Sequence, residues 1–332
     1  MLSAGKKMAA LCAAMILPLL LLLLLFPSSS ELVRLRNAMV FQSAPEADFQ
    51  WTPAAMPTDY RHEQAAVPDW LSQWVAPAKA LASQGALQQL VALSQKFEQH
   101  KRLGGAIQSD SQTALRAIEQ QSTGYCADYT QVTNGIAYAL GIPVREWGIS
   151  FDGFAGHGHA FSEIWDEQWQ KWIMLDLFNR FYAVDAQSKT PLSVLEFRQL
   201  LFKAPAQIEI KRTSDINFGF RDNQHLLDYF QQGRHSFFLY WANNSLSYDN
   251  HPLLVAGRSI SPHIEQLLAI TLGQFPPLRA IATAENNTQI QHMYQLKNLL
   301  WGILALESLL FLLLLVTFVR SLGTRLHRKD AQ

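Results

Sequence analysis

Two long apolar segments, one near each end of the 332-residue chain, limit what this sequence can fold into. The first covers residues 8–26 and includes a leucine run at 19–25, and the second covers residues 299–319. Each is long enough to cross the hydrocarbon core of a bilayer, about 30 Å thick, as a helix. A cleaved signal peptide shares the basic start and apolar run of the first segment, but residues 27–30 offer no clear small-x-small cleavage site. We therefore expect an uncleaved helix at both ends.

The basic residues of the two tails set the expected orientation. They are Lys6 and Lys7 before the first segment, and Arg320, Arg325, His327, Arg328 and Lys329 after the second. Two spans place both tails on one side of the membrane, and the positive-inside rule assigns that side to the cytoplasm. Arg34 and Arg36 weaken this asymmetry without reversing it. The central part of the chain is therefore expected outside the cytoplasm. The absence of disulfides and the leucine-rich anchor, taken together, favour a bacterial periplasm beside the inner membrane.

Glu307 interrupts the second apolar segment. A carboxylate in hydrocarbon is costly, so intramembrane acids are usually neutral, near the interface, or paired with a polar group on another helix. The residue therefore predicts a contact with another membrane protein, or a neutral acid that a leucine-rich helix tolerates.

Charge and motif content exclude several classes of protein. The chain has 27 basic and 27 acidic residues, and its net charge is zero, which argues against a nucleic-acid partner. It has no zinc-type cysteine spacing and no glycine-rich phosphate loop, so we expect no metal and no cofactor. Of the two cysteines, Cys12 lies in the first apolar segment. The central part therefore has no internal disulfide, and catalysis is one reason for its lone thiol, Cys126.

Cys126 opens a predicted helix over residues 127–140, where Val132, Ile136 and Leu140 recur at helical spacing. The first turn of a helix carries unpaired N–H groups and the positive end of the helix dipole, which favour an anion. The thiolate is the nucleophilic form of cysteine, so this position suits a nucleophile.

Two other chemically useful residues follow on predicted strands. Residues 144–149, 159–165 and 172–176 have the pattern of three short strands, with His159 opening the second and Asp176 closing the third. A neutral imidazole can take the thiol proton, and a carboxylate on the far ring nitrogen can orient the ring.

The sequence around these three residues resembles the transglutaminase-like superfamily. The resemblance is carried by residues 114–119, 124–129 (Gly-Tyr-Cys-Ala-Asp-Tyr), 139–145 (Ala-Leu-Gly-Ile-Pro-Val-Arg), 159–164 and 172–176. It implies an α+β, papain-like core in which a helix bearing the cysteine packs on an antiparallel sheet bearing the histidine and aspartate. It also implies that Cys126 is the nucleophile, His159 the general base and Asp176 the orienting residue. Phe161 stands where the family often has tryptophan.

Several residues compete for these roles or accompany them. The competitors are His157 for the base, and Asp166, Asn179 and Asp185 for the orienting group. Glu163 faces the opposite side of the sheet or pairs with Arg145. The backbone N–H of Cys126 and the side chain of Gln120 are candidate oxyanion donors.

The whole chain divides into seven expected segments. They are a cytoplasmic tail (1–7), a transmembrane helix (8–26), a loosely structured stalk (27–68), the transglutaminase-like domain (69–190), an accessory region outside the cytoplasm (191–297), a second transmembrane helix (298–319) and a basic cytoplasmic tail (320–332). Further helices are predicted at 85–103, 111–121, 191–202, 224–232 and 262–272, and further strands at 207–212 and 236–241.

These observations predict a membrane-anchored thiol enzyme that acts on amide bonds of a peptide or protein. Water as the acceptor of the acyl-thioester would make it a peptidase or amidase, and an amine would make it a transamidase. The alternative function is a binding or assembly module of a membrane or envelope complex, with an idle triad.

Overall fold

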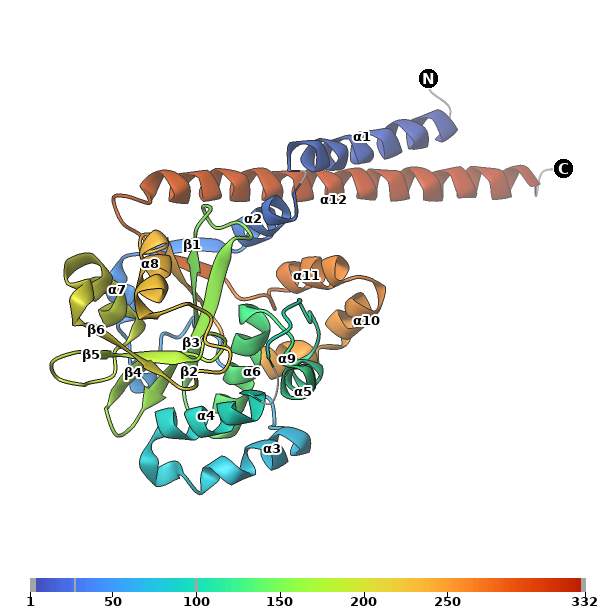
Figure 1. Ribbon diagram of the computed structural model, residues 1–332. Coiled ribbons are helices and arrows are strands. Elements are labelled where there is room, and N and C mark those ends of the chain that lie inside the picture. The colour runs from blue at the N-terminus through green and yellow to red at the C-terminus, as the bar shows by residue number, and fades with distance from the viewer. Residues whose placement is uncertain (1–3, 27, 99–100, 330–332) are drawn as a thin grey trace.

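A computed structural model describes residues 4–26, 28–98 and 101–329 of the chain. The centre of the protein is an eight-stranded sheet with helices on both faces (Figure 1). The strand order is β1-β8-β7-β2-β3-β4-β5-β6. The strands are β1 (Phe41–Ala44), β2 (Val144–Ser150), β3 (Gly158–Asp166), β4 (Lys171–Asp176), β5 (Phe181–Asp185), β6 (Ile208–Arg212), β7 (Phe237–Tyr240) and β8 (Leu278–Ile281). The three strands predicted around His159 and Asp176 are thereby confirmed, and the mixed helix and sheet content agrees with the expected α+β class.

Helices surround this sheet and extend beyond it at one end (Figure 1). They are α1 (Ala4–Leu25), α2 (Ser29–Met39), α3 (Asp69–Lys79), α4 (Ala86–Ser94), α5 (Ser111–Gln121), α6 (Cys126–Ala139), α7 (Val194–Lys203), α8 (Asn223–Gln232), α9 (Ser245–Asp249), α10 (Pro252–Ile260), α11 (Pro262–Thr271) and α12 (Asn287–Lys329). The helices predicted at 111–121, 127–140, 191–202, 224–232 and 262–272 correspond to α5, α6, α7, α8 and α11.

The two faces of the sheet bury different sets of helices. On one face, Ile164, Ile173 and Leu175 pack with apolar residues of α3, α4, α5 and α6. On the other face, Phe161 and Met174 pack with α7 and α8. Alternate residues of a strand point to opposite faces. His159 and Asp176 therefore share the α7–α8 face with Phe161 and Met174.

The segments predicted as a stalk and as an accessory region contribute strands to this same sheet. β1 comes from residues 27–68, and β6, β7 and β8 come from residues 191–297. β1 pairs in parallel with β8 although more than 230 residues separate Phe41 from Leu278 in the sequence. A strand of four residues shows too little alternation of apolar and polar residues to be recognised in a sequence. The pairing of β1 with β8 could therefore not be predicted from the hydrophobic pattern.

The helix predicted over residues 85–103 is shorter in the structure. α4 ends at Ser94, and a 3-10 turn follows at Gln95–Glu98. Further along, the backbone N–H of Arg102 donates to Asn217 Oδ1, and the N–H of Leu103 donates to the carbonyl of Ser122. These tertiary hydrogen bonds take the place of helical ones at residues 102 and 103, and residues 99–100 of the predicted helix lie outside the described residues.

The long helix α12 joins the domain to its C-terminal end. Its first turns pack on β1, β8 and α2 through Ile290, Met293, Leu296 and Leu300. Lys297 Nζ donates to the carbonyl of Phe41 at 2.7 Å, and Trp301 Nε1 donates to the carbonyl of Met39 at 3.1 Å. Beyond these contacts α12 leaves the domain, and α1 lies along it (Figure 1).

Among the described residues, one helix is long and apolar enough to cross a membrane. It is the part of α12 from Asn287 to Ser321, with a mean hydropathy of 2.5 over its most apolar window. The second expected span, at residues 8–26, is helical as α1 up to Leu25. A two-helix anchor with both tails in the cytoplasm stays a prediction.

Candidate active site

The thiol of Cys126 lies at the first residue of α6, where the sequence pattern predicted it. The Asp128 carboxylate caps the N-terminus of α6 by accepting a hydrogen bond from the backbone N–H of Tyr125 at 2.8 Å. It also accepts the N–H groups of Ile107 and Gln108, which fastens the preceding loop to the helix. Cys126 is half-buried between the exposed residues Tyr125 and Ala127. The helix start therefore holds Cys126 at a position that is only partly exposed to solvent.

His159 and Asp176 are hydrogen-bonded to each other in the interior of the protein. His159 Nε2 lies 2.6 Å from Asp176 Oδ2, and both side chains are buried. Asp176 also accepts the backbone N–H of Asn179 at 2.9 Å through Oδ1, and Asn179 Nδ2 at 2.9 Å through Oδ2. Because Nε2 of the imidazole is engaged by the carboxylate, Nδ1 is the ring nitrogen left to face the thiol.

Aromatic rings surround the imidazole and keep water away from it. Ring centroids lie about 6 Å from that of His159 on several sides, with Phe161 stacked on it and Phe178, Tyr229 and Phe230 at its edges. Tyr229 and Phe230 come from α8, in the part of the chain predicted as accessory. A charge pair in such a dry environment is stronger than the same pair in water.

The electrostatics of the site favour a thiolate and an imidazolium. Burial alone would raise the pKa of Cys126, but hydrogen bonds with His159 and with the backbone N–H of Ala160, and the charge of His159, bring this pKa below its ordinary value. Burial alone would lower the pKa of His159, but the charge and hydrogen bond of Asp176 and the interaction with Cys126 raise it to about 10. These shifts favour the thiolate form of Cys126 and the imidazolium form of His159, and the thiolate is the nucleophilic form of cysteine.

Comparison with known families agrees with this arrangement. Residues 74–177 match the family model of the transglutaminase-like superfamily. The chain contains a transglutaminase-like domain. The matched stretch runs from Trp74, in the middle of α3, to Leu177, the residue after β4, and it includes Cys126, His159 and Asp176. The chain matches no curated protein and no solved structure.

The residues that competed for these roles in the sequence lie away from the His159–Asp176 pair, with one exception. His157 is exposed, and its backbone N–H donates to Asp152. Asp166 lies at the far end of β3, where it accepts the N–H of Leu87. Asp185 closes a surface turn by accepting the N–H of Ser188. The exception is Asn179, which joins the triad as described above.

The remaining expectations on single residues also have outcomes in the structure. Glu163 pairs with Arg145 at 2.7 Å, which is one of the two alternatives left open. It does not face the side opposite His159, since the two are four residues apart on the same strand. Gln120 is exposed on the last turn of α5. The backbone N–H of Ala160, which donates to Cys126, was not expected as a donor from the sequence.

Two loops cover the triad from the side of Asn179. Arg102 stacks on the ring of Phe178 at 3.8 Å and donates to the Phe178 carbonyl. A Cβ atom at Gly219 would overlap Asn179 Oδ1, so glycine lets the loop between β6 and α8 approach this closely. No sequence motif marks these contacts, because they join segments more than 35 residues apart.

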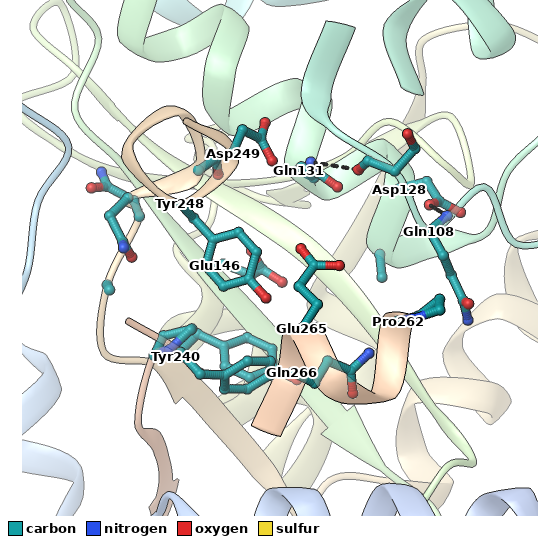
Figure 2. A pocket seen from close by; sticks show the side chains of 18 of the residues that line it. Gln108, Asp128, Gln131, Glu146, Tyr240, Tyr248, Asp249, Pro262, Glu265 and Gln266 are labelled. Atoms are coloured by element: carbon teal, nitrogen blue, oxygen red, sulfur yellow. Dashed lines mark hydrogen bonds between the residues drawn. The ribbon is translucent and has the colours of Figure 1, made fainter. Parts of the chain in front are cut away.

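A cavity of about 300 Å³ begins at the residues that directly follow Cys126. Ala127 and Asp128 form part of its wall, and Glu146, Tyr240 and Tyr248 point into it (Figure 2). The Glu146 carboxylate accepts Asn134 Nδ2 at 3.0 Å. No motif in the sequence points to Glu146. Arg145 and Glu146 are nevertheless consecutive charged residues in a strand covered on both faces, which is a signal that each face holds a polar group.

The Asn179→Ala substitution is expected to lower turnover by roughly 10- to 100-fold, because it removes a donor from the carboxylate that orients His159. A hydrogen bond to a charged group contributes roughly 1.5–3 kcal/mol, and about 1.4 kcal/mol corresponds to ten-fold. Steady-state kinetics should show a lower kcat with little change in KM, since Asn179 acts through the His159–Asp176 pair, with Nδ2 at 2.9 Å from Asp176 Oδ2 and 3.1 Å from His159 Nε2. Asn223→Ala, at the exposed start of α8, is the control and should behave as wild type. An unchanged kcat in Asn179→Ala would contradict this positioning role.

The Glu146→Gln substitution is expected to stabilise the protein at neutral and alkaline pH. Burial raises the pKa of Glu146 to about 7, and the hydrogen bond from Asn134 only partly offsets it. Because the folded pKa exceeds the unfolded one, ionised Glu146 disfavours the folded state above pH 7, and this cost fades as the pH falls to about 4.5. Glutamine avoids the cost, so the gain should reach up to about 3 kcal/mol at pH 8. Denaturant unfolding at pH 4.5 and 8 tests this, and an equal difference at both pH values would contradict it.

Proposed function

We propose that the protein is a membrane-anchored thiol enzyme that breaks amide bonds of a peptide or protein through an acyl-thioester. The observation that carries this proposal is the buried His159–Asp176 pair at 2.6 Å beside a thiol whose pKa is lowered. The match of residues 74–177 to the transglutaminase-like superfamily supports it.

The chemistry follows from the positions of the three side chains. The Cys126 thiolate attacks the amide carbonyl carbon, and an S–C bond forms. The imidazolium of His159 then gives its proton to the amide nitrogen, the C–N bond breaks and the amine leaves. Neutral His159 next removes a proton from water or from an acceptor amine, whose attack on the thioester releases Cys126. Asp176 stabilises the imidazolium through both halves of the reaction.

The membrane part of the proposal rests on α12. Its apolar stretch extends beyond the domain and is almost entirely uncovered by it. The length and hydropathy of this stretch are those of a membrane-spanning helix. With α1 lying along it, and with the basic tails counted above, the catalytic part would face the periplasm of a bacterial cell.

Acylation by an activated ester tests the enzymatic proposal without a known substrate. Full-length protein in detergent is mixed with p-nitrophenyl acetate, and mass spectrometry then locates the acetyl group. We expect a rapid burst of nitrophenolate with acetylation of Cys126, and loss of the burst in Cys126→Ala. A fluorescent primary amine added to the mixture distinguishes transamidation from hydrolysis by its incorporation. Equal bursts in wild type and Cys126→Ala would contradict the proposal.

A second candidate is an assembly module with an idle triad, and Glu307 favours it. Its Oε1 atom is shielded from water and has no hydrogen-bond partner among the described residues. A polar group on another membrane protein would satisfy it. If the protein is such a module, a Cys126→Ala variant should retain its function in cells. If the protein is a thiol enzyme, the same variant should lose that function.

A further inference from the structure

The hairpin formed by α10 and α11 exposes large apolar side chains to its surroundings. They are Leu253, Val255, Ile260, Ile264, Leu267 and Leu272, each exposed by 40% or more and Ile260 by 72%. Surface helices in water normally turn polar residues outward. A contiguous exposed apolar surface instead marks a contact with a partner or with lipid.

The charged residues of this hairpin are turned inward and paired with each other. Between residues 252 and 272 the only formal charges are those of Arg258 and Glu265, apart from His263. Arg258 Nη2 lies 2.7 Å from Glu265 Oε1 and 3.6 Å from Asp249 Oδ1, and Glu265 is buried. The outer surface of the hairpin therefore shows no Asp, Glu, Lys or Arg side chain to solvent beyond the partly exposed Arg258.

The exposed hydroxyl groups of the hairpin are also satisfied internally. Ser259 Oγ donates to the carbonyl of Ala256 at 2.7 Å, and Thr271 Oγ1 donates to the carbonyl of Leu267 at 3.0 Å. Such bonds to the preceding helical turn let Ser and Thr face a medium that offers no hydrogen bonds.

The position of the hairpin relative to α12 favours lipid as its partner. α10 and α11 project from the domain in the direction in which α12 runs to its C-terminal end, at the level of the part of α12 that has left the domain (Figure 1). If α12 crosses a bilayer along its own axis, the hairpin meets the same bilayer. Burial of apolar surface there is favourable by about 25 cal/mol per Å².

The hairpin also forms one wall of the cavity that begins beside Cys126. Arg258, Pro262, Glu265 and Gln266 of α10 and α11 line this cavity, and so do Ala127 and Asp128 of α6. Figure 2 shows Pro262, Glu265 and Gln266 beside the cavity. An amphiphile lying in the leaflet around the hairpin would therefore reach the cavity by moving past α11, without first dissolving in water.

We propose that the α10–α11 hairpin is embedded in the lipid leaflet on the domain's side of the membrane, and that the substrate reaches the cavity beside Cys126 from that leaflet as a membrane-bound amphiphile. This inference rests on the proposed membrane span of α12 and on the proposed role of Cys126.

Depth-dependent fluorescence quenching tests the position of the hairpin. In a full-length Cys12→Ala, Cys126→Ser background, single cysteines from Leu267→Cys, Leu309→Cys and Trp169→Cys carry an environment-sensitive fluorophore. The proteins are reconstituted in phosphatidylethanolamine–phosphatidylglycerol vesicles containing lipids with nitroxide-labelled acyl chains. Leu309 is exposed in the apolar stretch of α12, and Trp169 is exposed in the turn between β3 and β4.

We expect the label at position 267 to be quenched to within about two-fold of the label at 309, and the label at 169 to stay unquenched. Quenching at 309 with none at 267 would overturn the embedded hairpin while leaving the α12 span intact. Absence of quenching at 309 would overturn both.

Substrate access is tested with acyl donors of different chain length in protein that retains Cys126. The doubly substituted Ile264→Asp, Leu267→Asp protein should acylate Cys126 at the wild-type rate with water-soluble p-nitrophenyl acetate. With a long-chain p-nitrophenyl ester held in vesicles, its rate should fall at least ten-fold. Equal rates with the long-chain ester would overturn entry from lipid, whereas loss of reaction with both esters in wild type would instead refute the thiol-enzyme proposal.

Discussion

Replacing His159 by Gln is expected to lower amide turnover by at least about 10⁴-fold, because the variant loses both the base that ionises Cys126 and the acid that protonates the leaving amine. Losses of this size follow the removal of one member of a catalytic triad. The Cys126 pKa should also rise, since the hydrogen bond and charge of His159 are what bring it below its ordinary value. Hydrolysis of p-nitroacetanilide, an amide, measures the first effect, and the pH dependence of Cys126 acylation by p-nitrophenyl acetate measures the second.

His157→Gln is the matched control for this experiment. His157 is two residues earlier, exposed, and held by a backbone hydrogen bond to Asp152 that glutamine keeps. It should retain the wild-type rate. If His157→Gln loses activity and His159→Gln keeps it, the assignment of the base is wrong.

Replacing Arg145 by Met is expected to destabilise the fold by about 3–5 kcal/mol, because it leaves Glu163 charged and buried without its cation. Both side chains of this pair are buried, with Arg145 Nη2 and Glu163 Oε2 2.7 Å apart. The guanidinium lies over the rings of Trp51 and Trp172, at 4.6 and 4.2 Å. Chemical denaturation in detergent should show a lower midpoint with an unchanged dependence on denaturant.

The double variant Arg145→Met, Glu163→Leu distinguishes two causes of the lost stability: the unpaired charge of buried Glu163, and the lost packing of the Arg145 guanidinium. Because it removes both charges, it should recover a large part of the stability that Arg145→Met loses. Glu163 also accepts Trp147 Nε1 at 2.6 Å and the N–H of Val194 at 2.8 Å, so recovery should stay incomplete. A double variant no more stable than the single one would show that packing of the guanidinium, and not its charge, holds this part of the sheet.

The candidate site residues could be proposed from the sequence, because their signals are local and the resemblance to the transglutaminase-like superfamily points to the same three positions. Cys126 starts a helix with a clear apolar period, and His159 and Asp176 stand at the ends of short apolar strands. These patterns depend on residues within one turn or one strand. They place the three side chains on elements that the fold then brings together.

The rest depends on contacts between distant segments, which local patterns do not encode. Tyr229 reaches His159 because β6 and the loop after it return the chain to the α7–α8 face of the sheet. Gly219 and Asn217 reach Asn179 and Arg102 through the same loop. The residues predicted as an accessory region therefore complete the surroundings of the His159 imidazole. No residue spacing in the sequence predicts this contact.

The pH dependence of Cys126 alkylation tests the central claim most directly. A Cys12→Ala protein is treated with iodoacetamide over pH 4–10, and modification of Cys126 is followed by mass spectrometry. The thiolate–imidazolium pair exists from the lowered pKa of Cys126 up to the pKa of His159 at about 10. The predicted midpoint of the reaction is therefore below the value near 8.5 of a free thiol. A midpoint at or above 8.5, unchanged in His159→Gln, would show that Cys126 is an ordinary buried cysteine and would contradict the account.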